Sequence, residues 1–289
     1  MPEHGSPTVR RRRLAAELRR LRERSGLTGD DVASELGWSA SKISRYELAR
    51  TGLKPADVKK MLHLYEVDEA SQLELIELAR EATRKGWWED YGDALPGQYA
   101  DLIGLEDEAR SCRIWQIECV PGLLQIRDYA RQVNVPAQDV ARVPPGARER
   151  LVEVRMRRQQ ILDRDPPAEL DVILDESALL RQLAEPGVMR AQLEFLAERT
   201  RLPNVTIRVV PLAGQPRGVE SSFVVLSFGR SAPAALNDVV SIENFENTLY
   251  FEGEMQTYHY RLMFDLLAGS ALDPADSLRL IEQAGRRWA

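Results

Sequence analysis

Cysteine and histidine are scarce in this chain of 289 residues, which has two cysteines, Cys112 and Cys119, and three histidines. Two cysteines are too few for a disulfide scaffold and agree with a reducing compartment. The histidines, His4, His63 and His259, lie far apart in the sequence. They therefore provide neither the spacing of a zinc site nor material for a Ser-His-Asp triad. We expect no metal site and no enzymatic activity.

Long apolar runs are also missing. No segment approaches the roughly 20 apolar residues of a membrane-spanning helix. No apolar run follows the N-terminal arginines, as it would in a secretory signal. No glycine-rich loop of the kind that binds nucleotide phosphates is present either. We therefore expect a cytoplasmic protein that needs no cofactor and has no membrane partner.

The chain nevertheless has enough apolar material for a core, with 44% hydrophobic and 29% charged residues. Its length corresponds to about two domains. Residues 1–65 carry 14 Lys and Arg against 8 Asp and Glu, a balance of +6, whereas the other 224 residues carry 25 against 37, a balance of −12. A basic N-terminal part on an acidic body suggests a nucleic-acid-binding domain, and a chance cluster of arginines is the alternative.

Apolar periodicity and capping residues predict five short helices and no strand in the N-terminal part. Thr28 and Ser39 are suited to begin the second and third helices as N-caps, and Gly37 is suited to end the second. The five predicted helices cover residues 9–24, 28–36, 39–48, 55–65 and 69–85.

Residues 27–47 have the spacing of a helix-turn-helix motif. Ala33 is small where two helices must cross closely, and Gly37 fits a tight turn with a positive φ. Ile43 would pack the later helix on the earlier one, which leaves the opposite face free to enter a DNA major groove.

The free face of that later helix is predicted to read bases. Ser41, Lys42 and Arg45 share the side opposite Ile43, and such basic and hydroxyl side chains can bond base edges or phosphates. Arginines of the first helix and Lys54 are candidates for phosphate contacts. The complete set of predicted DNA-binding residues is Ser39, Ser41, Lys42, Arg45, Arg10, Arg11, Arg12, Arg13 and Lys54.

The segment from Leu27 to Glu47 resembles the helix-turn-helix of the Cro/C1-type repressors, the xenobiotic-response-element (XRE) family. The resemblance implies a transcription regulator that binds double-stranded DNA. It also implies that Glu47 pairs with a basic residue of the first helix and has a structural role. The family usually has Gln where this chain has Gly29, so a DNA contact from that side chain is missing. We expect a homodimer that binds a near-palindromic site.

The remaining chain has the pattern of an α/β or α+β domain with a sheet of about five strands. The predicted strands are the apolar or β-branched runs at 170–174, 205–210, 223–228, 239–243 and 248–251. The predicted helices cover about 122–133, 146–163, 187–200, 254–268 and 274–287. The pattern of residues 106–118 is typical of neither a helix alone nor a strand alone. We thus expect an all-α five-helix domain over 9–84, a linker over 85–105 and an α/β domain over 106–289.

The order of several segments in this second part resembles a large C-terminal domain of unknown function that follows helix-turn-helix modules in actinobacterial, WhiJ-like regulators. The matching segments are residues 99–106, 120–125, 128–130, 202–206 and 276–281. The resemblance implies a transcription regulator. We expect its C-terminal domain to dimerise and to sense a partner or a ligand. Genes of such relatives often lie beside one for a small protein. The alternative function is therefore an antitoxin-like protein that mainly binds a small partner encoded by an adjacent gene.

Two further groups of residues have open interpretations. Asp175 and Glu176 follow a predicted strand, where they could act as an acid–base pair or cap the next helix. Five aromatic residues could line a small-molecule pocket or pack the junction of the domains: Trp87, Trp88, Tyr91, Trp115 and Tyr129.

Overall fold

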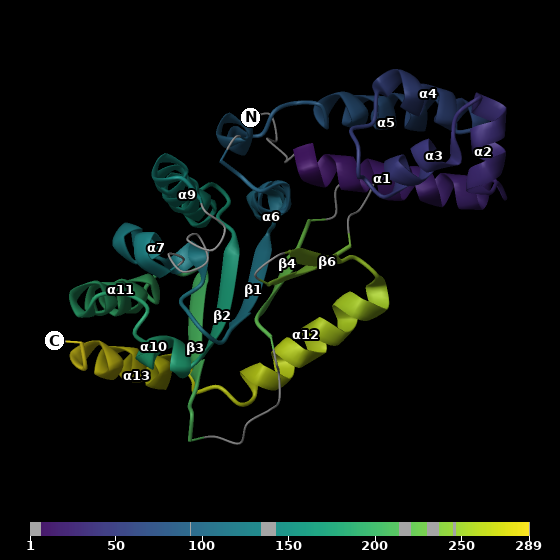
Figure 1. The fold of residues 1–289 in the computed structure, drawn as a ribbon. Helices are drawn as coiled ribbons and strands as arrows, with labels where there is room; N and C mark the ends of the chain where they lie inside the picture. The colour runs from purple at the N-terminus through teal and green to yellow at the C-terminus, as the bar shows by residue number, and fades with distance from the viewer. Residues whose placement is uncertain are drawn as a thin grey trace. The chain divides into compact units, whose positions relative to one another are not determined.

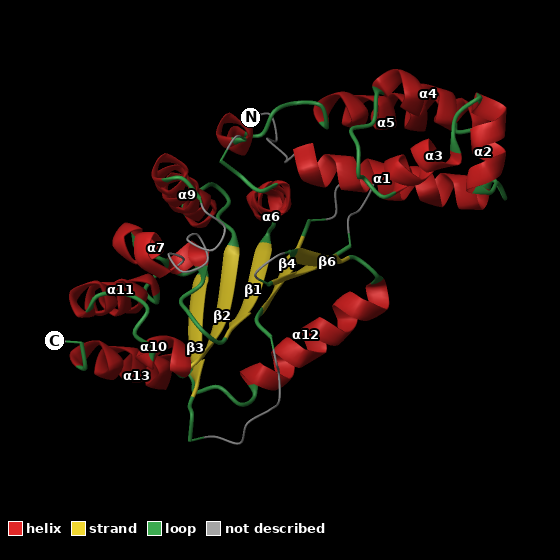
Figure 2. Ribbon diagram, viewed as in Figure 1, coloured by secondary structure: helices red, strands yellow, loops and turns green. Residues whose placement is uncertain are grey.

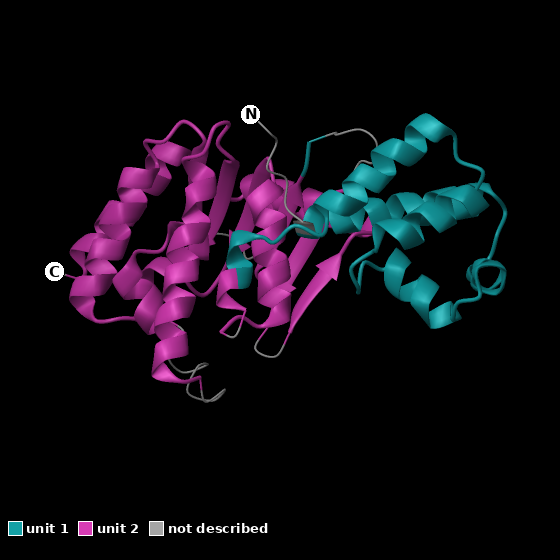
Figure 3. Ribbon diagram, turned by 90° about the horizontal axis from the view of Figure 1, so that it is seen from above, with its two compact units in different colours: residues 1–89, 228–236 teal, residues 90–227, 237–289 magenta. Residues whose placement is uncertain are grey.

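A computed structural model describes residues 7–92, 94–133, 143–213, 221–229, 237–244 and 247–288. The chain forms two compact units, shown in different colours in Figure 3. The N-terminal unit comprises residues 1–89 and 228–236, and the C-terminal unit comprises residues 90–227 and 237–289. Each unit has a hydrophobic core of its own. No helix within the described ranges is long and apolar enough to cross a membrane.

The N-terminal unit contains the five predicted α-helices (Figure 1). They are α1 (Pro7–Arg24), α2 (Gly29–Leu36), α3 (Ala40–Glu47), α4 (Pro55–Leu64) and α5 (Glu69–Glu81). Fully buried side chains from several of these helices, among them Leu14, Ile43, Met61 and Leu75, form its core. Each of the five helices therefore contributes one apolar face to a shared core.

Side-chain caps fix the limits of α2 and α3. The Thr28 hydroxyl accepts a hydrogen bond from the Asp31 N–H at 3.1 Å, and the Asp31 carboxylate accepts one from the Thr28 N–H at 2.8 Å. This reciprocal pair is a capping box. Gly37 ends α2 with a φ of 65°, a conformation that costs glycine little. Ser39 then caps α3 by accepting from the Lys42 N–H, as the sequence predicted.

The C-terminal unit is built on a six-stranded sheet (Figure 2). The strands are β1 (Ser111–Gln116), β2 (Glu169–Asp175), β3 (Val205–Val210), β4 (Phe223–Ser227), β5 (Val239–Glu243) and β6 (Thr248–Phe251). Their order is β3-β2-β1-β4-β5-β6. The pairs β1–β2 and β2–β3 are parallel, and the other three pairs are antiparallel. The sixth strand is β1, in the segment whose state the sequence left open.

Helices cover both faces of this sheet. They are α6 (Gly97–Glu108), α7 (Arg127–Val133), α9 (Pro145–Arg158), α10 (Ser177–Leu180), α11 (Pro186–Arg199), α12 (Glu254–Ala268) and α13 (Pro274–Arg286). The short 3-10 turns are η1 (Trp87–Tyr91), at the boundary between the units, and η2 (Gly122–Leu124) and η3 (Gln159–Leu162) of the C-terminal unit. On one face, Phe264 and Leu267 of α12 pack against Trp115, Val225 and Val240 of the sheet. On the other, α6, α9, α7, α11 and α13 pack one against the next.

The segment expected to be a linker, residues 85–105, holds η1 and most of α6. Pro96 directly precedes α6, and Gly97 is its first residue. Three of the α6 side chains, Leu102, Ile103 and Leu105, are buried in the C-terminal unit. The division between the two units falls at residues 89 and 90, within this segment.

Candidate nucleic-acid interface

The third helix presents one face to solvent and buries the other. Ile43 and Tyr46 are only 1% and 5% exposed. The exposed residues recur at helical spacing and belong to one face: Ala40, Ser41, Ser44, Arg45 and Leu48, with the capping residue Ser39 beside them. The structure thus brings together three predicted residues, Ser39, Ser41 and Arg45. It adds Ser44, which the sequence could have identified because it lies three residues after Ser41.

Lys42 differs from that prediction, because its side chain turns away from the exposed face. Its ammonium group lies 2.8 Å from the Asp57 carboxylate of α4 and 3.5 Å from the centroid of the Trp38 ring. Asp57 also accepts a hydrogen bond from the Tyr46 hydroxyl at 2.6 Å. Lys42 therefore holds α3 against α4, and a base contact would require it to leave both partners.

The charges around Lys42 alter the titration of its neighbours. Burial disfavours the charged form of Asp57, but hydrogen bonds from Lys42 and Tyr46 outweigh this and lower the pKa of the carboxyl below its ordinary value. Burial and the bond to Asp57 raise the pKa of Tyr46 to about 12. At neutral pH the cluster therefore contains a charged carboxylate and a protonated phenol donor.

Glu47 has the structural role that the resemblance implied. Its carboxylate accepts two hydrogen bonds from the Arg22 guanidinium of α1, at 2.7 and 3.0 Å. The two side chains are 9% and 13% exposed. Arg22 also donates to the Leu27 carbonyl oxygen at 2.8 Å. This bidentate pair ties the end of α3 to α1 and removes an acidic group from the exposed face.

Further basic side chains lie near this face in the sequence and are solvent-exposed. Arg50 and Lys54 are in the loop between α3 and α4, and Lys59 is on α4. Among the described residues, Arg45, Arg50 and Lys54 make no ion pair. Their side chains are thus exposed and carry charges without an ion pair in the described part of the chain, and the phosphate contact of Lys54 stays a prediction.

The arginines of α1 differ from one another in exposure. Arg10 and Arg13 are each only 7% exposed. Arg10 forms an ion pair with Glu81 of α5 at 3.4 Å, and Arg13 donates to the Gly229 carbonyl oxygen at 3.4 Å. These two arginines are therefore held inside the structure and are not displayed for phosphates, contrary to the prediction. Arg11 and Arg12 are partly exposed.

The two carboxylates that were candidates for acid–base chemistry, Asp175 and Glu176, accept hydrogen bonds from backbone N–H groups. Asp175 accepts from the N–H of Ser177, the first residue of α10, at 2.9 Å. Glu176 accepts from the Leu212 N–H at 2.7 Å.

Of the predicted aromatic set, Trp88, Trp115 and Tyr129 are buried, at most 4% exposed. Among the described residues, no three or more His, Cys, Asp or Glu side chains are placed so that they could hold a metal ion.

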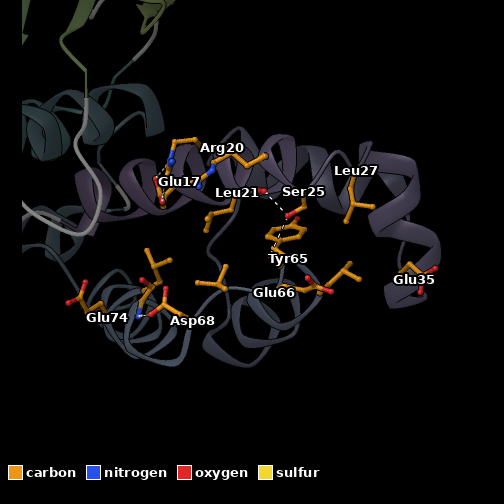
Figure 4. A pocket seen from close by; sticks show the side chains of 15 residues that line it. Glu17, Arg20, Leu21, Ser25, Leu27, Glu35, Tyr65, Glu66, Asp68 and Glu74 are labelled. Carbon is orange, nitrogen blue, oxygen red and sulfur yellow. Dashed lines mark hydrogen bonds and ion pairs between the residues drawn. The ribbon is translucent and has the colours of Figure 1, made fainter.

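The N-terminal unit also contains a groove of about 920 Å³ between α1 and the turn that joins α4 to α5 (Figure 4). Its apolar lining residues include Leu21, Leu64 and Leu75. Charged side chains alternate with them, five acidic and two basic: Glu17, Glu35, Glu66, Asp68, Glu74, Arg20 and Arg24. The groove therefore combines apolar side chains with a mainly acidic border, and none of the predicted aromatic residues lines it.

The capped α2 and α3, joined through a left-handed glycine and with a polar exposed face on α3, define a helix-turn-helix protein. A family model described as a helix-turn-helix domain matches residues 13–75. A second, described as a domain of unknown function (DUF5753), matches residues 99–283. The chain belongs to this DUF5753 family and is a helix-turn-helix protein of the DNA-binding regulator class. A search of the curated proteins finds no match for it.

Proposed function

We propose that the chain is a sequence-specific transcriptional regulator of the XRE type, in which α3 enters the DNA major groove. The exposed face of α3 carries this proposal, because it presents Ser41, Ser44 and Arg45 while its opposite side is buried. Arginine can bond guanine bidentately, and serine hydroxyls can bond bases or phosphates. The resemblance to actinobacterial WhiJ-like regulators supports the same function.

The other polar residues of the N-terminal unit have supporting roles. Arg50 and Lys54, which are exposed and make no ion pair within the described residues, contact phosphates. Lys42 positions α3 through Asp57. The C-terminal unit supplies dimerisation and senses a ligand or partner. Two copies then place two recognition helices on half-sites about 34 Å apart.

The first test is to select fragments of the source genome that the full chain binds, at about 150 mM salt, and to sequence them. Non-specific phosphate binding weakens steeply with salt, so specific sites stand out under this condition. We expect one enriched motif with two-fold symmetry. An Arg45→Ala chain, selected in parallel, should lose enrichment at defined base positions. If neither the chain alone nor the chain with its neighbouring gene product enriches any sequence, the proposal is wrong.

A second candidate function is binding of a small partner protein encoded by an adjacent gene, as in antitoxin-like regulators. The groove in the N-terminal unit favours it, because its apolar lining and acidic border suit a basic amphipathic peptide. Co-purification of the two gene products tests this function. The Glu74→Arg variant should weaken the complex. The Glu77→Arg variant, on the same helix but outside the groove lining, should not.

The proposal places the protein in the cytoplasm, where it acts on DNA without catalysis or a cofactor. Asp175 and Glu176 support this assignment, because both carboxylates already hold backbone N–H groups. An acid–base pair would instead direct its oxygens to a substrate.

A further inference from the structure

Helix α12 has an exposed apolar face in addition to the face that it packs on the sheet. Phe264 and Leu267 are buried in the sheet-facing core. Four large side chains on the outer side are exposed: Met255 (66%), Tyr258 (47%), Leu262 (43%) and Leu266 (49%). Their spacings of three, four and four residues place them in one stripe along the helix.

This stripe is large enough to be an interface. It extends over roughly 16 Å of helix, at about 1.5 Å for each residue. Its four side chains expose on the order of 400 Å², comparable to apolar patches that mark interaction sites on monomers. When two such stripes and their flanking residues meet, the buried area reaches on the order of 1,000 Å², which is the lower limit for a specific interface. A second copy of the same helix therefore suffices to cover it.

We infer that α12 is the dimer interface and that it packs antiparallel against α12 of a second copy of this chain. This inference rests on the proposed function, which requires two copies at one operator. A symmetric dimer needs a self-complementary surface. With a two-fold axis between Tyr260 and Arg261, Met255 lies opposite Leu266 of the other copy, and Tyr258 lies close to its Leu262. The stripe is therefore nearly symmetric about its own centre.

Two charged residues that flank the stripe are already paired within the same chain. Asp265 lies 3.6 Å from Arg113 of β1, and Arg261 lies 2.7 Å from Asp238. Neither residue therefore brings an unpaired charge to the contact.

The oligomeric state of the full chain tests the inference. In sedimentation equilibrium we expect the wild type to be a dimer. The dissociation constant of the Leu262→Glu dimer should be at least a hundredfold higher, because this dimer buries two carboxylates in an apolar contact. The matched control is Leu73→Glu, which replaces another exposed leucine, 65% exposed on α5, and should dimerise like the wild type. Thermal unfolding checks that Leu262→Glu remains folded. A monomeric wild type, or a folded Leu262→Glu chain that dimerises normally, overturns the inference.

Cysteine cross-linking tests the antiparallel register. Under mild oxidation, Tyr258→Cys combined with Leu262→Cys should give a covalent dimer in high yield. Leu262→Cys alone should cross-link several-fold more slowly, because that position is displaced from the two-fold axis. Faster cross-linking of the single variant would indicate parallel helices and overturn the antiparallel arrangement.

These measurements are separate from the test of DNA binding. A chain that enriches a DNA motif but is monomeric contradicts the α12 interface and leaves the proposed function intact. A chain whose dimer is broken by Leu262→Glu but that enriches no DNA supports the interface and contradicts the proposed function.

Discussion

Arg45 and Lys42 lie three residues apart on α3 but have different surroundings. Arg45 is exposed, whereas Lys42 is bound to Asp57 and stacked on Trp38. A side chain that is already paired must lose that pairing before it can bond a base, so the two basic residues are not equivalent candidates. We therefore expect specific recognition to depend on Arg45 and the neighbouring hydroxyl groups.

Replacing Arg45 by Ala should weaken binding to the selected operator by about 1–3 kcal/mol and relax the preference at one or two base positions. Fluorescence anisotropy with the operator and with single-base variants measures both effects. Lys54→Ala serves as the comparison, because loss of a phosphate contact should weaken binding to all sequences equally and reduce the salt slope by about 1. Equal losses on operator and random DNA in the Arg45→Ala variant would remove Arg45 from the base-reading set.

Asp57 should make the N-terminal unit sensitive to acid. Its pKa is lowered in the folded state, so its contribution to stability is present at neutral pH and is lost as the pH falls through the folded pKa. We expect Asp57→Asn to lower the free energy of unfolding by about 1–3 kcal/mol at pH 7, the usual effect of a hydrogen bond to a charged group. Native-state hydrogen exchange in α3 and α4 measures the loss.

The difference between the Asp57→Asn chain and the wild type should shrink below about pH 4, the range in which an ordinary Asp becomes protonated. The Asp30→Asn chain, altered at an exposed carboxylate of α2, controls for the general effect of losing a negative charge. A pH-independent difference would show that the Asp57 contribution does not come from its charge.

The turn between α2 and α3 depends on the left-handed backbone of Gly37. A side chain at this φ of 65° is strained although open space surrounds it, so Gly37→Ala should cost about 1–2 kcal/mol. Gly29→Ala is the matched control. Its new methyl group would lie 3.9 Å from Ile43, an ordinary contact, and the change should be neutral or stabilise by about 0.4–1 kcal/mol. Thermal unfolding of both variants gives the comparison, and equal stabilities would contradict the strain argument.

Elements with a local signal were predictable from the sequence, and those that depend on distant partners were not. Thr28, Gly37 and Ser39 mark the ends of α2 and α3 by their own chemistry, so these helices were predicted to within about a residue. The strand β1 has Arg113 and Gln116 among its six residues and was left undecided. It is a strand because it pairs with β2 on one side and with β4 on the other.

The same distinction applies to the candidate site. Arg45 could be placed on the exposed face of α3 from helical periodicity alone. Lys42 pairs with Asp57, which lies on α4. The helical periodicity of α3 shows which of its own residues share a face, but it does not show which residues of another helix they contact. Burial of Arg10 against Glu81 likewise depends on the packing of α1 with α5, although both residues were visible as charges in the sequence.

In the whole molecule, the charge balance changes from positive to negative before the boundary between the units. The N-terminal unit as a whole carries 18 Lys and Arg against 15 Asp and Glu, a balance of +3, whereas the C-terminal unit carries 21 against 30, a balance of −9. An acidic body repels DNA phosphates, which favours contacts through the basic unit only. The two units also have separate cores, so we expect that they unfold as separate cooperative units.

The C-terminal unit contains a buried ion pair between α9 and α6. Arg158 of α9 donates two hydrogen bonds of 2.8 Å to Glu106 of α6 and a third to the Tyr99 hydroxyl. Burial opposes the positive charge, but Glu106 and Tyr99 outweigh it and raise the pKa of Arg158 above its ordinary value. The guanidinium also lies against Gly122. Arg158 therefore joins residues 99–106 to residues 120–125, two of the segments on which the family resemblance rests.

Replacing Arg158 by Ala should destabilise the C-terminal unit by about 3–5 kcal/mol, because Glu106 is left buried and unpaired. Adding Glu106→Ala should recover part of this loss, since the second change removes the isolated charge. Arg190→Ala, which removes an exposed ion pair with Glu194 on α11, should cost less than about 1 kcal/mol. Hydrogen exchange resolved by segment should show faster exchange in β1, β2 and α9 of the Arg158→Ala chain and unchanged exchange in α1 to α5. Destabilisation of both units together would instead show that the chain folds as a single cooperative body.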